Sequence, residues 1–125
     1  METFYVTTLS WKEVADGGLR KLMNCWHQVY AREAQEHMAS ATGGARLQKV
    51  PMKVYTGTAE EAKDWAERFG NHDYYILMNA AAKSAVEESG EALNVLGELN
   101  ENEIPEGFSV LIELSRYLQP LESGA

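Results

Sequence analysis

Three carboxylates in the segment VEESGEAL could carry chemistry because of their spacing. Glu87, Glu88 and Glu91 lie in residues 71–99, which we predict to be one long helix because apolar residues recur there at three- and four-residue steps. Carboxylates at i, i+3 and i+4 share one side of a helix, and Glu106 could add a fourth from the next element. Such a set could form an oxygen cage for Mg²⁺, which would neutralise nucleotide phosphates and activate a water for attack.

This pattern resembles the signature of the MazG-like all-α nucleoside triphosphate pyrophosphohydrolases, which is EExxE followed by ExxD on the next helix. Residues 87–91 match the first half, and residues 106–109 would be the second half, with Ser109 in place of the aspartate. A hydroxyl is a much weaker Mg²⁺ ligand than a carboxylate. The resemblance covers residues 72–118 and implies Mg²⁺-dependent cleavage of a nucleoside triphosphate to the monophosphate and pyrophosphate. The alternative is a solvated carboxylate face that binds no metal.

The letters GNHD at residues 70–73 form a second candidate site. The same letters occur in dinuclear metallophosphoesterases, where an Asn and a His bind metal at the end of a strand. Here they follow a predicted helix, and the sequence has no DxH or GDxxD block to accompany them. We therefore predict that Asn71 or Asp73 caps the long helix instead.

Two acidic residues and two histidines form a third candidate site. Glu33 and His37 are one helical turn apart and, with Glu36 and His27, could share a metal. The alternative is an ordinary surface contact. Cys25 has no evident base or CxxC partner, so we predict a semi-buried structural thiol.

The elements that would position these residues follow from local patterns. Residues 3–9 and 47–55 alternate and predict strands, and Pro51 places the second strand at a sheet edge or beside a bulge. An apolar stripe predicts a helix over residues 19–38, ended by the TGG at residues 42–44. Capping boxes begin at Ser10 with Glu13 and at Thr58 with Glu61, and the second opens a short helix that stops at Gly70.

Residues 108–118 fit two structures. A helical step joins Phe108, Leu111, Ile112, Ser115 and Leu118. Strand alternation would join Val110, Ile112 and Leu114. Periodicity does not separate the two in a short apolar run, and we favour a helix because the pattern continues to Leu118.

The fold class follows from these elements. We expect one α+β globular domain over residues 1–125, mainly helical, with two long helices, one or two short helices and a small sheet of two or three strands. The sequence shows no internal repeat and no linker. Trp11, Trp26 and Trp65 are all expected in core packing, although Trp11 lies outside any clear stripe, so that an exposed position stays open for it as the alternative.

The charge of the chain is divided unevenly. The 125 residues carry a formal charge of −8, with seven basic and five acidic side chains in residues 1–57 but four basic and fourteen acidic ones in residues 58–125. An acidic half repels phosphate, so we expect no direct nucleic-acid binding. One cysteine and the lack of an apolar run of about 20 residues indicate a cytoplasmic protein that does not span a membrane.

These observations favour a protein-binding module, an inhibitor or adaptor without a cofactor, that docks its acidic C-terminal half on a basic surface of a partner protein, such as a nucleic-acid-binding surface. In size and acidity the chain is similar to small phage-encoded anti-defence proteins, anti-CRISPR proteins among them. The candidate docking residues are Glu87, Glu88, Glu91, Glu98, Glu101 and Glu103. The alternative enzyme would bind Mg²⁺ through Glu87, Glu88, Glu91 and Glu106. A third hypothesis is a structural protein that self-associates, for example as a homodimer, through its long helices.

Overall fold

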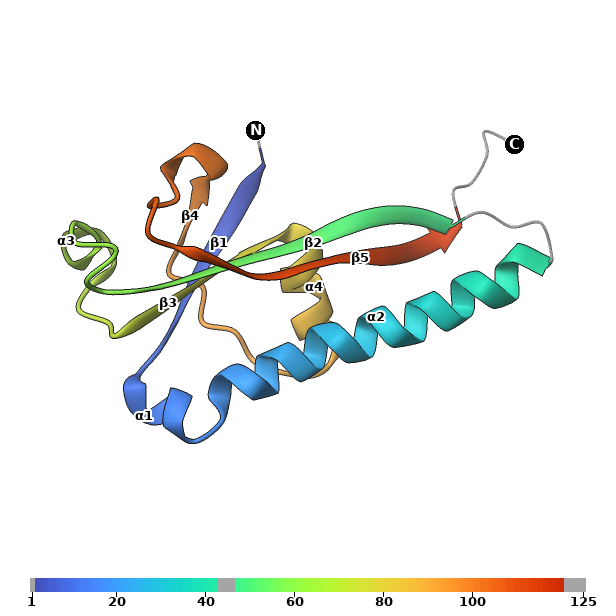
Figure 1. Ribbon diagram of the computed structural model, residues 1–125, viewed down its shortest axis with the longest axis horizontal. Helices are drawn as coiled ribbons and strands as arrows, with labels where there is room; N and C mark the ends of the chain where they lie inside the picture. Colours follow the sequence, from blue (N-terminus) through green and yellow to red (C-terminus); the bar gives the residue numbers. More distant parts are fainter. Residues whose placement is uncertain (1, 43–46, 121–125) are drawn as a thin grey trace.

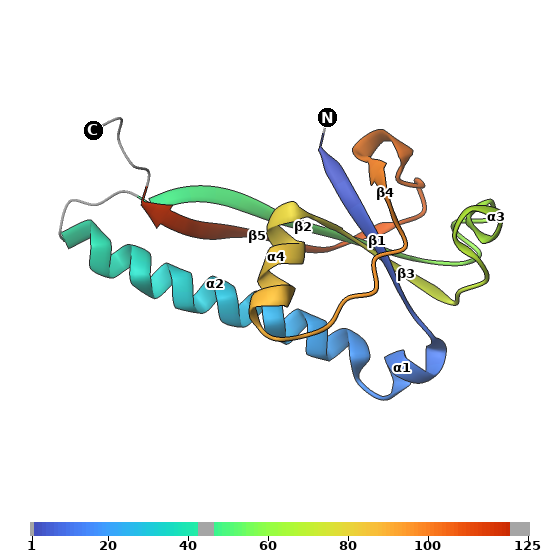
Figure 2. The ribbon, with the colours of Figure 1, turned by 180° about the vertical axis from the view of Figure 1, so that it is seen from behind.

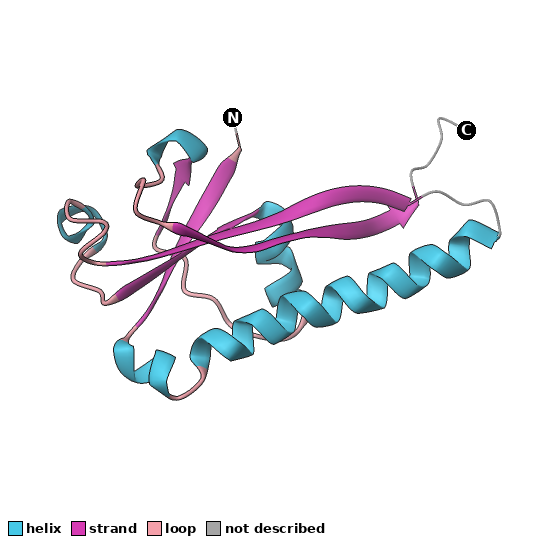
Figure 3. Ribbon diagram, in the orientation of Figure 1, coloured by secondary structure: helices cyan, strands magenta, loops and turns pink. Residues whose placement is uncertain are grey.

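The computed structural model describes residues 2–42 and 47–120 of the chain. In these residues five antiparallel strands form one sheet, in the order β4-β1-β3-β2-β5, together with four α-helices and a short 3-10 helix (Figures 1 and 3). The strands are β1 (Thr3–Leu9), β2 (Leu47–Thr58), β3 (Tyr74–Asn79), β4 (Gly97–Asn100) and β5 (Ser109–Pro120). The helices are α1 (Trp11–Ala15), α2 (Gly18–Thr42), α3 (Trp65–Phe69), α4 (Ala80–Glu88) and η1 (Glu101–Glu103). The prediction of a mainly helical domain with two or three strands is therefore wrong.

The predicted long helix at residues 71–99 is wrong, because this stretch forms β3, α4 and β4. In β3, Tyr75 and Leu77 face one core while Ile76 and Met78 face the other. A strand buried on both faces reads as a continuous apolar run, which also fits a helix. The helix begins only after Asn79, whose side chain accepts a hydrogen bond from the Ala82 N–H at 3.1 Å; Asn71 and Asp73 are not its caps.

The favoured helix at residues 108–118 is also wrong, because the segment is the strand β5. Its buried Ile112 pairs with Val54 of β2, but the next pair along the ladder is Val110 with Tyr55. Leu111 is therefore the extra residue of a β-bulge. The extra residue Leu111 is apolar too and, with Ile112 and Leu118, completed the helical step that competed with the strand alternation of Val110, Ile112 and Leu114.

Most predictions that rest on local signals are confirmed. β1 has the predicted bounds, the Ser10–Glu13 capping box is formed, and α2 includes the predicted residues 19–38. The helix continues to Thr42, and residues 43–44, predicted to end it, lie outside the described residues. The prediction that the Thr58–Glu61 capping box opens a helix is wrong. The Glu61 carboxylate accepts a hydrogen bond from the Thr58 N–H at 2.8 Å, but the two residues begin a turn, and α3 begins only at Trp65; the predicted stop at Gly70 is confirmed.

Two cores lie on the opposite faces of the sheet. Helices α2 and α4 cover one face, where Trp26 of α2 is fully buried and donates its indole N–H to the carbonyl of Ala82 at 3.0 Å. Figure 2 shows α4 lying across the sheet on this face, beside α2. Residues 59–69 and 104–108 cover the other face, where Trp65 packs with Phe4 and Leu99. Trp26 and Trp65 are thus core residues, as predicted.

The β2–β5 ribbon extends beyond the other strands, and α2 runs alongside it (Figure 1). Pro51 lies in this extension, where β2 has no strand pairing on its β3 side. The Pro51 carbonyl accepts a hydrogen bond from the side chain of Asn79 instead, at 3.0 Å. The prediction that Pro51 places its strand at a sheet edge or beside a bulge is wrong for the strand as a whole, because β2 lies between β3 and β5; only the part of β2 that contains Pro51 lacks a neighbour on one side. Among the described residues, none of the helices combines the length and the apolar character that crossing a bilayer requires.

Candidate functional site

The three carboxylates of VEESGEAL do not form the row that helical spacing predicted. Helix α4 ends at Glu88, so Glu91 lies beyond it, in the connection to β4. Lys83 Nζ lies 2.8 Å from Glu87 Oε1, and Lys21 Nζ of α2 lies 3.3 Å from Glu91 Oε2. Each of these carboxylates is therefore partly neutralised by a basic side chain of the same molecule.

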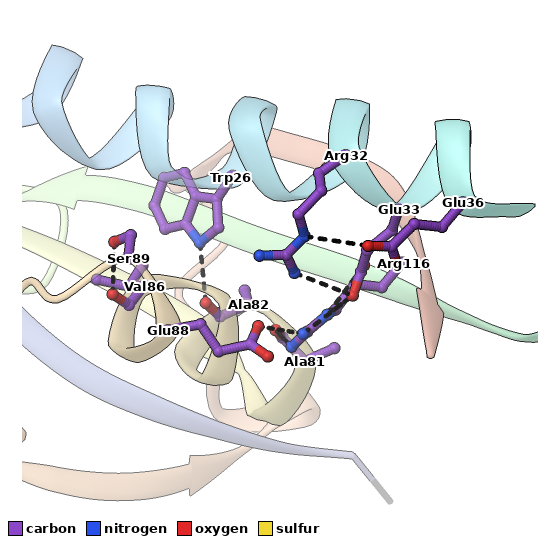
Figure 4. A network of polar contacts seen from close by, with 10 residues as sticks. All are labelled: Trp26, Arg32, Glu33, Glu36, Ala81, Ala82, Val86, Glu88, Ser89 and Arg116. Carbon is purple, nitrogen blue, oxygen red and sulfur yellow. Dashed lines mark hydrogen bonds and ion pairs between the residues drawn. The ribbon is translucent and has the colours of Figure 1, made fainter. Parts of the chain in front are cut away.

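The third carboxylate, Glu88, accepts a hydrogen bond from the buried Arg116 (Figure 4). The Arg116 guanidinium donates to the Glu33 carboxylate from Nε at 3.3 Å and from Nη2 at 3.2 Å. Its Nη1 donates to the carbonyl of Ala81 at 3.2 Å, and Nη2 also donates to Glu88. Arg116 and Glu33 are only 2% and 5% exposed, so this network lies in the interior between β5, α2 and α4.

The geometry of the network indicates a structural role, because it holds β5, α2 and α4 together. Four of the five N–H groups of the Arg116 guanidinium already have acceptors within the protein, which leaves one Nη1 N–H for any further contact. A buried ion pair is tolerated when its polar atoms are hydrogen-bonded in this way. Arg32, on the outer side, lies 3.6 Å from Glu33 and 4.0 Å from Glu36 and links the network to solvent.

The third candidate site is not assembled, because Glu33 points to Arg116. The His37 ring stacks on Tyr117 with 4.4 Å between ring centroids, and His27 is exposed. In the part of the chain that the structure describes, no group of three or more His, Cys, Asp or Glu side chains is placed to hold a metal ion.

Glu106, the fourth predicted magnesium ligand, lies far from α4 in the fold. It precedes Gly107, whose backbone packs against the side chain of Glu61. Both neighbours belong to the segments that cover the face of the sheet opposite α4. The four predicted ligands are thus not brought together.

The GNHD letters form the turn between α3 and β3. Gly70 ends α3 with a φ of +88°, a value that favours glycine. The ring of His72 is hydrogen-bonded to the carbonyl of Phe69 at 2.8 Å, and the Asp73 carboxylate accepts the backbone N–H of Trp11 at 3.0 Å. These side chains hold the turn in place and tie it to α1.

Cys25 is buried, as the prediction of a structural thiol requires. Its Sγ donates to the carbonyl of Lys21 at 3.3 Å and accepts from the Ser89 hydroxyl at 2.9 Å. The thiol therefore joins α2 to the end of α4.

A different group of carboxylates gathers where residues 58–73 pack against residues 97–107. We call these two segments together the acidic end; they include α3, β4 and η1, which lie at one end of the molecule (Figures 1 and 2). Arg68 Nη1 lies 3.0 Å from Glu103 Oε2, and Arg68 Nη2 donates to the carbonyl of Glu98 at 3.2 Å. Beneath this contact the rings of Trp65 and Phe108 meet edge to face, with 5.3 Å between centroids.

The acidic end carries nearly the whole net charge of the chain. It contains nine acidic and two basic side chains, which give −7 of the total of −8, whereas the rest of the chain has ten acidic and nine basic ones. All nine carboxylate side chains belong to exposed residues. They are Glu60, Glu61, Asp64, Glu67, Asp73, Glu98, Glu101, Glu103 and Glu106.

One of these carboxylates has an altered affinity for protons. The backbone N–H of Asn100 donates to Glu103 at 3.1 Å, and this hydrogen bond, together with Arg68, holds the pKa of Glu103 below its usual value. The carboxylate therefore stays negative when the solution is mildly acidic.

A small recess borders the acidic end. It has a volume of about 210 Å³ and is lined by Trp11, Thr58, Ala59, Glu60 and Asp73. Trp11 is 52% exposed, which decides between the two positions left open by the sequence. The recess thus combines an exposed indole with two carboxylates.

Sequence reasoning found part of this surface. Glu98, Glu101 and Glu103 were among the predicted docking residues and belong to the acidic end, but the acidic residues of the 58–73 segment were missed. The signal for them is the density of acidic residues in that segment, which the count of fourteen acidic side chains in residues 58–125 already includes. The chain was also compared with protein-family models, with curated proteins and with solved structures, and none of the three comparisons gave a match.

Proposed function

We propose that the protein is a binding module, an inhibitor or adaptor, that docks its acidic end on a basic surface of a partner protein. The observation that supports this proposal is the charge distribution, with −7 on the acidic end and −1 on the rest of the chain. Complementary potentials raise association rates and fix the orientation of two partners. A surface of this charge would compete with nucleic acid for a nucleic-acid-binding partner, and it would itself repel phosphate.

The proposed docking surface differs from the one expected from the sequence. Glu98, Glu101 and Glu103 remain part of it, together with the carboxylates of residues 58–73. The carboxylates on and after α4 form ion pairs with Lys83, Lys21 and Arg116. Their negative charge is therefore partly neutralised within the molecule. Action in a reducing compartment such as the cytoplasm belongs to the same proposal and is supported by the buried free thiol of Cys25.

Two variants with the same change in net charge test the proposal. The first is the acidic-end variant Glu98→Gln/Glu101→Gln/Glu106→Gln. The control is Glu36→Gln/Glu87→Gln/Glu113→Gln, which also removes three exposed carboxylates but none from the acidic end. Tagged wild type and both variants are used to capture proteins from a cell extract at about 0.05 M and about 0.5 M NaCl, since salt screens exposed charges.

The expected result is a basic protein that wild type and the control variant retain at low salt and that the acidic-end variant loses. Direct titration of that purified protein should then show a weaker Kd for the acidic-end variant alone. Equal loss in both variants would mean that net charge, and not the acidic end, governs binding. Capture that is insensitive to salt would also contradict the proposal.

A further inference from the structure

The recess beside the acidic end has a composition suited to one type of side chain. The residues that line it include Trp11, which is half exposed, and the acidic residues Glu60 and Asp73. An aromatic face and a carboxylate both attract cations, and the surrounding acidic end adds a negative potential. The recess therefore favours a cationic side chain over a neutral or anionic one.

Trp11 is held in place although half of it is exposed. The capping box of Ser10 and Glu13 fixes the first turn of α1, where Trp11 is the first residue. The backbone N–H of Trp11 donates to Asp73 Oδ2, and its ring lies against that of Tyr74 with 5.7 Å between centroids. An exposed aromatic residue with a fixed backbone loses little conformational freedom on binding, which is typical of an interface anchor.

We infer that this recess binds an arginine side chain of the basic partner. The inference rests on the proposed function and names the group that anchors the acidic end. Asp73 uses one carboxylate oxygen for Trp11 and has another for a guanidinium. A guanidinium is planar, stacks on aromatic rings and donates to carboxylates from its edge, whereas the lysine ammonium is a strongly hydrated point charge. The recess has a volume of about 210 Å³, which is larger than a guanidinium group.

The experiment uses the full chain and two synthetic basic peptides. The peptides are identical except that one has arginine and the other lysine at every basic position. Their Kd values are measured by titration calorimetry at low salt with wild type, Trp11→Ala, Trp11→Phe and Asp73→Asn. Tyr30→Ala, which removes an exposed aromatic side chain from α2, is the control.

Wild type and Tyr30→Ala should bind the arginine peptide about threefold to tenfold more tightly than the lysine peptide, as expected for an exposed or partly desolvated cation–π contact. Trp11→Ala should abolish this preference, Trp11→Phe should keep part of it, and Asp73→Asn should reduce it. Circular dichroism of each variant checks that the fold is retained.

Three outcomes would overturn the inference. If both peptides bound equally and both were weakened by the acidic-end variant, the acidic end would dock without an arginine site, and the proposed function would stand. If neither peptide bound wild type at low salt, both proposals would fail. If light scattering showed a dimer of the free protein that Trp11→Ala dissociates, the occupant would be a second copy of this chain.

Discussion

Arg116 and Glu33 are 83 positions apart in the sequence, yet the guanidinium of Arg116 donates to the Glu33 carboxylate at 3.2 Å in the interior of the protein. The contact ties the last strand of the sheet to the middle of α2. Because Ala81 and Glu88 accept from the same guanidinium, α4 is held at the same point. Three elements from different parts of the chain, α2, α4 and β5, thus share one buried cation.

Replacing this cation should destabilise the protein strongly. We expect Arg116→Met to lower the free energy of unfolding by about 3 kcal/mol, because the buried Glu33 would lose its hydrogen-bonded cation and keep only the more distant, exposed Arg32. Urea denaturation measures the loss. The control is Arg32→Ala, whose side chain is 53% exposed and which should change stability by less than about 1 kcal/mol. Adding Glu33→Leu to Arg116→Met should recover much of the loss, and a double variant as unstable as the sum of the two would contradict the buried ion pair.

Asn79 should be a second position of high sensitivity, because one buried side chain serves three elements. Its Oδ1 accepts from the N–H groups of Lys53 and Ala82, and its Nδ2 donates to Glu2 and to the Pro51 carbonyl. Asn79→Ala removes this partner from the backbone groups of Lys53, Ala82 and Pro51, although Glu2 keeps its ion pair with Lys53, and should cost about 2 kcal/mol or more.

The stability of a second variant at this position, Asn79→Asp, should depend on pH. The new carboxylate would be buried and would face the Glu2 carboxylate and the Pro51 carbonyl. These effects should outweigh the two N–H groups, of Lys53 and Ala82, that face its other oxygen, so its pKa in the folded state should exceed that in the unfolded state. The folded state then binds the proton more tightly, and the variant should lose stability as the pH rises from about 4 to about 7. Thermal unfolding across this range tests it, and a variant that gains stability with pH would contradict the assigned orientation of the amide.

Local signals in the sequence were sufficient for β1, the Ser10 capping box and α2, because their patterns reflect hydrogen bonds and packing between near neighbours. The errors at β3 and β5 concern segments whose structure depends on distant partners. Tyr75 and Ile76 are both buried because helix α2 and the 59–69 segment cover opposite faces of the sheet. A single sequence does not reveal which segments will cover each face of the sheet.

The same limit applies to the candidate site. Glu91 was predicted to be available for a metal or partner, but Lys21 approaches it from a helix distant in the sequence. Asp73 was predicted as a helix cap, whereas it binds the backbone of Trp11, 62 positions away. The acidic composition of residues 58–125 could be predicted from the sequence. Which of their carboxylates form ion pairs within the molecule could not.

Glu103 should give the stability of the acidic end a defined pH dependence. Its folded pKa lies below its usual value because of the Asn100 N–H and Arg68, so it stabilises the folded state above the unfolded pKa and this contribution is lost as the pH falls through the folded pKa. Glu103→Gln should therefore be less stable than wild type at neutral pH, and the difference should close from about pH 5 downwards. Urea denaturation at several pH values measures it, with Glu106→Gln as the control. A difference that persists at the lowest pH would assign the effect to packing.

Gly57 should tolerate no side chain, because the ring of Phe108 lies directly over it. A Cβ at this position would be 2.2 Å from Phe108 Cδ1, so Gly57→Ala must displace the ring from its contact with Trp65. We expect a loss of about 1–3 kcal/mol, as for other overpacked cores. Phe108→Ala should cost stability alone, but the double variant should cost less than the sum, because the alanine methyl group then fills space that the ring has left.

The same pair connects stability to the proposed function. Trp65 and Phe108 join the two segments of the acidic end from below, so displacing the ring should also loosen the spacing of the carboxylates above it. Gly57→Ala should therefore weaken binding of the basic peptides in proportion to its loss of stability, while the control variant Tyr30→Ala leaves both unchanged. Wild-type affinity in a destabilised Gly57→Ala protein would show that docking depends on net charge alone and not on the arrangement of the two segments.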